Sequence, residues 1–146
     1  MLDGASLLLR ALPRSELAVQ FPILISPAMR PLFAIFGFRA RQSYVALDDD
    51  GLSVRFGTAN EHVPLPAIRS VARQRWPFYY GLGPKLGPSG TVAYVGSYAG
   101  VVRIAFADAR PMNVWGPFAR REANGVIVSL EDADAFVDVL RSRLPA

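Results

Sequence analysis

The chain has 146 residues, of which 51% are hydrophobic, with no cysteine, a formal net charge of +4 and an isoelectric point of about 10.0. This length and apolar content exclude a disordered chain and predict one domain with a real core. The absence of cysteine excludes disulfides, thiol chemistry and zinc–thiolate sites.

The N-terminal quarter is rich in apolar residues but is interrupted throughout. The richest window, Val19 to Phe38, contains prolines and an arginine, so we expect no membrane-spanning helix. The charges flanking the leucines at residues 7–9 have the wrong order for a secretory signal, so we expect a cytoplasmic protein. Residues 1–15 predict an N-terminal arm or short helix, and residues 16–146 a single domain.

Strand patterns begin at residue 16. Residues 16–25 predict a first strand, which Pro22 would confine to an edge or a bulge. Residues 28–36 follow a Ser-Pro pair and predict a short helical or irregular crossover. Residues 42–47 and 52–56 then predict a hairpin across Asp50-Gly51, because glycine suits such turns. The three acids at residues 48–50 lack the spacing of a calcium loop.

The middle of the chain predicts further short strands. Residues 61–65 and 68–74 indicate the next strand or a bent pair of strands split by prolines. Residues 76–88 indicate a loop, and residues 91–96 with 101–106 a second hairpin. Residues 108–124 are polar and are expected to be irregular, ahead of a last strand at residues 126–128. The total is about seven strands.

The C-terminal segment predicts a helix. Ser129 and Asp132 match the capping box, acids occupy the first turn, and arginines occupy the last. Apolar residues recur at helical spacing, namely Leu130, Ala133, Phe136, Val137, Leu140 and Leu144. A lone helix with one apolar stripe must pack that stripe on a sheet.

Most catalytic constellations are missing. His62 is the only histidine, no Gly-x-Ser-x-Gly elbow occurs, and the glycines of residues 81–87 do not match the dinucleotide or phosphate-loop patterns. We therefore expect no enzyme, no catalytic or metal-binding residue and no cofactor. An enzymatic interpretation would need a site around His62, Asp108 or Glu122.

Two patches combine aromatic and basic residues. The first, here called the aromatic–basic loop, comprises Arg73, Arg75, Trp76, Phe78, Tyr79, Tyr80 and Lys85. It suits a plug of the fold, a partner contact, stacking on nucleic-acid bases or a bilayer interface. The second, the Arg/Phe segment, comprises Arg30, Phe33, Phe36, Phe38, Arg39 and Arg41. It suits either a buried crossover or a membrane anchor with headgroup contacts.

Several segments together resemble the bacterial pleckstrin-homology-like (PH-like) domains. They are the hairpin at residues 44–56, the Pro-Leu-x-x-Ile-x-Ser-Val run from Pro64 to Val71, the strand at residues 101–106 and the final strand with its helix. The resemblance implies a mainly β (α+β) fold, a bent sheet or partial barrel of about seven antiparallel strands capped by one C-terminal helix.

The resemblance also implies binding or scaffolding rather than catalysis. In phosphoinositide-binding members a basic motif lies between the first two strands. The corresponding residues 26–41 offer Arg39 and Arg41 but lack the preceding lysine, so that specificity is not expected. We expect a module that engages a protein partner or a second copy of itself. Peripheral attachment to an anionic membrane is the alternative, and single-stranded nucleic acid ranks below both.

Overall fold

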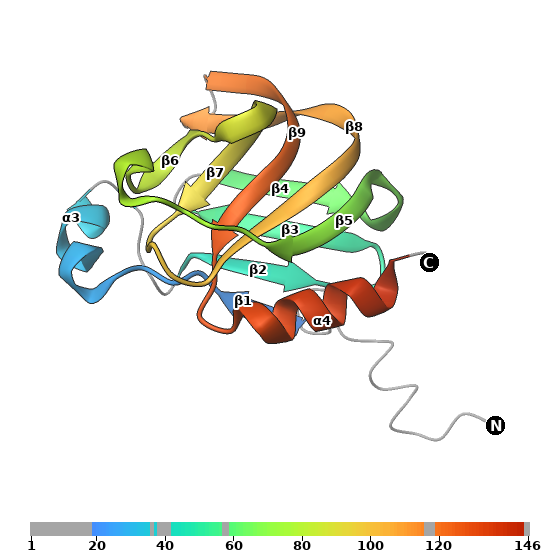
Figure 1. Ribbon diagram of the computed structural model, residues 1–146, viewed down its shortest axis with the longest axis horizontal. Coiled ribbons are helices and arrows are strands. Elements are labelled where there is room, and N and C mark those ends of the chain that lie inside the picture. The colour runs from blue at the N-terminus through green and yellow to red at the C-terminus, as the bar shows by residue number, and fades with distance from the viewer. Residues whose placement is uncertain (1–18, 36, 38–41, 57–58, 116–118, 145–146) are drawn as a thin grey trace.

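Nine strands in two sheets make up most of the computed structural model, which describes residues 19–35, 37, 42–56, 59–115 and 119–144 (Figure 1). The first sheet is an antiparallel meander in the order β1–β2–β3–β4. Its strands are β1 (Val19–Pro22), β2 (Tyr44–Leu47), β3 (Gly51–Phe56) and β4 (Ala59–Pro64).

The second sheet has the order β5–β8–β9–β7–β6. Its strands are β5 (Ile68–Arg73), β6 (Gly83–Leu86), β7 (Thr91–Val95), β8 (Val101–Trp115) and β9 (Ala119–Ser129). Figure 1 shows the strands of this sheet running across those of the first. The helical elements are η1 (Pro27–Met29), α3 (Arg30–Ile35), η3 (Leu65–Ala67), η4 (Phe78–Tyr80), η5 (Pro88–Gly90) and α4 (Ala133–Arg143).

The expected mainly β class with a C-terminal helix is confirmed, but the strand count and pairing differ. The described residues form nine strands rather than about seven, and no closed barrel. The pairing is also not wholly antiparallel, because β7 lies parallel to β9. The prediction of an N-terminal arm at residues 1–15 falls outside the described residues.

The first predicted hairpin is confirmed, although its glycine is needed for a different reason. β2 and β3 pair across residues 48–50, and Asp48 Oδ1 accepts hydrogen bonds from the backbone of Asp50 and Gly51 at 2.8 and 3.0 Å. A Cβ at Gly51 would lie 2.2 Å from the carbonyl oxygen of Val63 on the neighbouring strand β4. Glycine is therefore required by close backbone approach.

The second predicted hairpin is wrong. β7 and β8 follow one another in sequence but are not neighbours, because β9 lies between them and pairs with both. Every residue of β7 is buried, which requires partners on both of its edges and cover on both of its faces. A sequence-local hairpin gives β7 one partner only, and the distant strand β9 supplies the other.

The expected irregular stretch at residues 108–124 is wrong as well. β8 continues to residue 115 and β9 begins at residue 119, so most of this stretch is a long hairpin. Met112 and Val114 are buried, whereas Asp108, Arg121 and Glu122 face solvent. A strand with one solvated face carries many polar residues, which made this one look like a loop. Residues 76–88 were expected to form a loop, but they contain the short strand β6.

The predicted packing of the C-terminal helix is confirmed. Phe136 is fully buried, and its ring meets the ring of Phe21 on β1 edge-on at a centroid distance of 5.1 Å. Arg141 Nε donates to the carbonyl of Val71 on β5 at 3.2 Å. Figure 1 shows α4 along the lower border of the fold. The helix thus contacts both sheets.

The predicted helix cap is wrong. Asp132, not Ser129, is the N-cap, and its Oδ1 accepts from the backbone N–H of Ala135 at 3.4 Å. Ser129 lies at the end of β9 and is fully buried. Its hydroxyl accepts from Gly96 N and donates to the Leu24 carbonyl, both at 2.8 Å. The hydroxyl therefore joins three segments of chain instead of starting a helix.

Candidate binding surface

The aromatic–basic loop lies against the outer face of the second sheet, where Trp76 anchors it. Trp76 is 5% exposed and packs on Ala93, Val95, Val101 and Ile127, which form a small cluster separate from the main core. Its indole N–H donates to the carbonyl of Gly81 at 2.8 Å. Trp76 thus anchors the loop on the sheet, which fits the plug of the fold among the alternatives that the sequence left open.

The three aromatics after Trp76 are exposed on the 3-10 turn η4. Phe78 is 77% exposed, Tyr79 is 72% exposed, and Tyr80 is 38% exposed. The rings of Phe78, Tyr79, Tyr80 and Trp76 follow one another edge to face, with centroid distances of 5.1–5.6 Å. A buried tryptophan at one end therefore holds a ladder of rings that faces solvent at the other.

The backbone of this turn is fixed by several hydrogen bonds. Lys85 Nζ donates to the Tyr80 carbonyl at 2.9 Å, Tyr80 N donates to Pro77 O at 3.0 Å, and Gly81 N donates to Phe78 O at 3.1 Å. Gly81 has a φ of +76°, which glycine adopts without strain. The exposed rings thus stand on an ordered base, so a partner would not have to order the loop.

A small hollow adjoins the ring ladder. It has a volume of about 210 Å³ and is lined by Trp76, Tyr80, Leu86 and Pro88. Leu86 is itself exposed on β6. The hollow is therefore an apolar recess of about the size of one side chain beside the exposed rings.

The basic members of the loop have different roles. Arg73 forms an ion pair with Asp134 on α4 at 2.7 Å, and Lys85 is engaged by the Tyr80 carbonyl. Arg75 is exposed. Arg75 is thus the member whose charge the fold leaves to solvent.

The Arg/Phe segment is divided by the structure. Phe33 is 7% exposed, and its ring lies 6.2 Å from that of Phe56 inside the core, so Phe33 supports the fold and cannot anchor the protein elsewhere. Arg30 Nε donates to the Ile25 carbonyl at 3.2 Å. The remaining candidates, Phe36, Phe38, Arg39 and Arg41, fall outside the described residues.

Two large apolar residues of α3 are exposed, and the sequence analysis selected neither of them. Leu32 and Ile35 both face solvent, Ile35 at 79% exposure. Leu32 and Ile35 lie on either side of the buried Phe33 in the sequence. Helical spacing would have separated the exposed face from the buried face if the sequence had shown how long this helix is. The sequence analysis selected the phenylalanines of this segment instead.

α3 and η4 emerge at the same end of β7. Ile25, shortly before α3, pairs with Gly96, just beyond the last residue of β7. Gly83, shortly after η4, pairs with Val95. Figure 1 shows α3 and the turn that precedes β6 together on the left of the molecule. Exposed apolar residues of two distant segments therefore share one end of the fold.

A partly buried polar network that the sequence analysis missed joins the two sheets. Glu61 Oε1 on β4 accepts from Asn113 N on β8 at 2.8 Å and from Arg120 on β9 at 3.3 Å. Arg120 also donates to Asn113 Oδ1 at 2.6 Å and to the Pro111 carbonyl at 3.1 Å. Every charge has a partner here, which is typical of a structural network.

Tyr94 completes this network from β7. Its hydroxyl donates to the Asn113 carbonyl, and its ring is fully buried. Burial raises the pKa of the Tyr94 hydroxyl, and the neighbouring Glu61 carboxylate raises it further. Tyr94 therefore stays protonated and donates its hydrogen bond throughout the physiological pH range.

The residues named for an enzymatic interpretation are exposed and lie on three different strands. His62 is exposed on β4, with its Nδ1 3.1 Å from Ser53 Oγ, while Asp108 and Glu122 are exposed on β8 and β9. Among the described residues, no three His, Asp or Glu side chains come together as a metal site would need.

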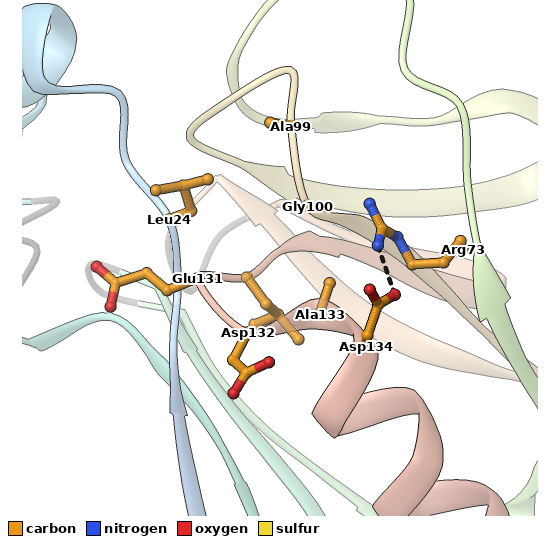
Figure 2. A pocket seen from close by; sticks show the side chains of 9 residues that line it. Leu24, Arg73, Ala99, Gly100, Glu131, Asp132, Ala133 and Asp134 are labelled. Atoms are coloured by element: carbon orange, nitrogen blue, oxygen red, sulfur yellow. Dashed lines mark hydrogen bonds and ion pairs between the residues drawn. The ribbon is translucent and has the colours of Figure 1, made fainter.

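The start of α4 also borders a hollow, of about 280 Å³. Figure 2 shows that Asp134 points to Arg73, whereas the carboxylates of Glu131 and Asp132 point away from that pair. Asp132 is occupied as the helix cap. Asp132 caps the helix and Asp134 pairs with Arg73 on β5, and the three carboxylates do not converge on a shared point.

No family model, curated protein or solved structure matches this chain. Within the described ranges, no helix has the length and apolarity needed to cross a bilayer.

Proposed function

We propose that this protein is a non-catalytic binding module of PH-like architecture, and that it holds a protein partner or a second copy of itself through the exposed aromatic turn η4. The observation that carries the proposal is the ladder of Phe78, Tyr79 and Tyr80, exposed on a hydrogen-bonded base. Large aromatics held out to solvent are typical of interface hot spots.

The architecture supports a PH-like module in its order of elements. An antiparallel four-stranded meander comes first, a second sheet crosses it, and a helix docked on both sheets ends the fold. The parallel β7–β9 pair and the additional strands are departures from the seven-stranded pattern. The architecture alone assigns no partner, so the proposal depends on the surface.

Charge indicates what kind of partner surface would fit. No Asp or Glu occurs between Glu16 and Asp48 or between Glu61 and Asp108, although these two stretches contain eight of the sixteen basic residues. They supply α3 and η4. An acidic partner surface would be attracted there, while the rings and the adjoining hollow would supply the desolvated centre of the contact.

Size-exclusion chromatography with light scattering over a range of protein concentrations tests this function. We expect the wild type to self-associate or to retain a partner, and the double variant Phe78→Ser/Tyr79→Ser to lose that association. Val19→Ser, which changes an exposed apolar residue of β1, serves as the matched control and should behave as the wild type. A strictly monomeric wild type that retains no partner would contradict the proposal.

The exposed pair Leu32 and Ile35 favours a second function, attachment to an anionic membrane surface. Together with Phe78 and Tyr79 they give one end of the fold four exposed apolar side chains from acid-free stretches. Flotation with anionic and neutral liposomes distinguishes this function from the first. Binding to anionic liposomes that Leu32→Ser/Ile35→Ser abolishes would favour the membrane. Single-stranded nucleic acid has less support, because burial of Trp76 leaves the smaller rings of η4 as the stacking faces.

A further inference from the structure

We infer that the outer face of β5 and β8 holds a binding site for a phosphate group, distinct from the aromatic turn. A hollow of about 360 Å³ lies on this face and is lined by Arg69, Ser70, Ala72, Gln74, Arg103 and Ala105. Four of the six have side chains that can hydrogen bond, and the other two are alanines, which are small enough to let a ligand approach the sheet.

Strand pairing explains how the lining is assembled. Ser70 lies opposite Ala105, and Ala72 lies opposite Arg103, so these side chains project from neighbouring positions of two adjacent strands. A bulge between Ile68 and Ser70 shifts the register and accommodates Arg69 as an additional residue. Bulges of this kind re-aim a side chain, and here Arg69 joins the lining of the hollow.

The two arginines have no anionic partner in the part of the chain that the structure describes. Among the described residues, neither Arg69 nor Arg103 forms an ion pair, unlike Arg73 and Arg120. The Nε of Arg103 is buried and has no hydrogen-bond acceptor among the described residues. Native structures rarely leave a buried donor unmatched, so this N–H needs an acceptor that the described residues do not supply.

Phosphate is the anion that fits this set of donors. Two guanidinium groups and the Ser70 hydroxyl offer donors to several oxygens at once, and a phosphate group has more oxygens to accept them than a carboxylate. The planar fork of arginine matches phosphate geometry better than an ammonium group does. The absence of acids from residue 62 to residue 107 leaves the local charge unopposed along the chain.

The phosphate group has two sources to consider, a small soluble molecule and a lipid headgroup. The test uses ¹⁵N-labelled full-length protein titrated with inorganic phosphate, with chloride at matched ionic strength as the reference. A parallel arm uses phosphatidylcholine vesicles with and without phosphatidic acid. We expect saturable shifts of the amides of Ser70, Ala72 and Arg103 in the phosphate titration, or vesicle binding that requires phosphatidic acid.

Variants decide whether this hollow is responsible. Arg69→Gln and Arg103→Gln should each weaken binding by roughly tenfold or more, because each removes a charge-assisted hydrogen bond. Arg55→Gln on β3 is the matched control and should bind as the wild type. Arg69 is exposed, so its variant keeps the test decisive even where Arg103→Gln disturbs folding.

Each outcome bears on the inference. Arginine-dependent binding in the solution arm identifies a soluble phosphate ligand, and arginine-dependent binding in the vesicle arm alone identifies a headgroup. No binding in either arm would overturn the inference, as would binding that both glutamine variants retain in full. The result is independent of the aromatic turn, because Phe78→Ser/Tyr79→Ser should leave phosphate binding intact.

Discussion

Replacing Ser129 by alanine separates the sequence-based account of the C-terminal helix from the structural one. If Ser129 capped the helix, its loss would cost about 1 kcal/mol. In the structure the hydroxyl is fully buried and makes two hydrogen bonds of 2.8 Å, one from Gly96 N and one to Leu24 O. The alanine variant leaves a buried donor and a partly buried acceptor unmatched.

The magnitude follows from these two lost bonds. An unmatched buried polar group costs about 1–3 kcal/mol, so we expect Ser129→Ala to lower the free energy of unfolding by about 2–4 kcal/mol. Asp132→Ala removes the true cap, but this cap is exposed and its hydrogen bond is long, at 3.4 Å. Its loss should cost about 0.5–1 kcal/mol.

Urea unfolding at equilibrium, followed by circular dichroism, measures both variants. Ser142→Ala, on the exposed face of α4, is the matched control and should stay within about 0.5 kcal/mol of the wild type. The structural account requires Ser129→Ala to be the most destabilised of the three. An Asp132→Ala variant that is equally or more destabilised would refute the reasoning.

Three further predictions concern the docking of α4, the turn before β8 and the buried Tyr94. Phe136→Ala should cost about 3–5 kcal/mol in urea unfolding, because the ring is fully buried against Phe21, and a wild-type melt would show that α4 is not docked. Gly100→Ala should cost at least about 1 kcal/mol, because Gly100 has a φ of +68° and a Cβ would lie 2.2 Å from the Leu130 carbonyl oxygen; Ala99→Gly is the control. Because the pKa of Tyr94 is higher in the folded protein than in the unfolded chain, the protonated hydroxyl contributes to the stability of the fold. This contribution is complete below the ordinary tyrosine pKa of 10.0 and is lost as the pH rises above it. Unfolding midpoints should therefore fall more steeply above pH 10.0 in the wild type than in Tyr94→Phe, and parallel curves would contradict that sign.

Local signals in the sequence were sufficient for some elements of the fold. The hairpin of β2 and β3 was recognisable from Asp50-Gly51 between two alternating runs, and α4 from its apolar stripe. Both depend on contacts between residues close in sequence. The start of α4 was misplaced because Ser129 matches the capping pattern while its buried partners, Gly96 and Leu24, are distant in sequence.

Strand order and the polar network depend on long-range pairing, which the sequence pattern does not encode locally. No residue pattern near β7 predicts that β9 pairs with it in parallel. Glu61 and Arg120 looked like ordinary charged residues, yet they meet between the sheets at 3.3 Å. A long-range ion pair of this kind has no local signature.

The candidate surface was predicted in composition but not in detail. The aromatic–basic loop stood out because aromatics and bases alternate there, and Phe78, Tyr79 and Tyr80 are indeed exposed. The pattern did not distinguish Trp76, which is buried, from its neighbours. In α3 it favoured Phe33 over Leu32 and Ile35, although Phe33 is the buried residue of the three.

Photocrosslinking from position 79 in living cells tests the proposed binding surface most directly. A photoreactive phenylalanine analogue replaces Tyr79 in one variant and His62, which is exposed on β4, in the control. We expect a discrete protein adduct of higher mass on irradiation of the position-79 variant and none from position 62. No adduct from position 79, or the same adducts from both positions, would contradict a role for η4 in partner binding.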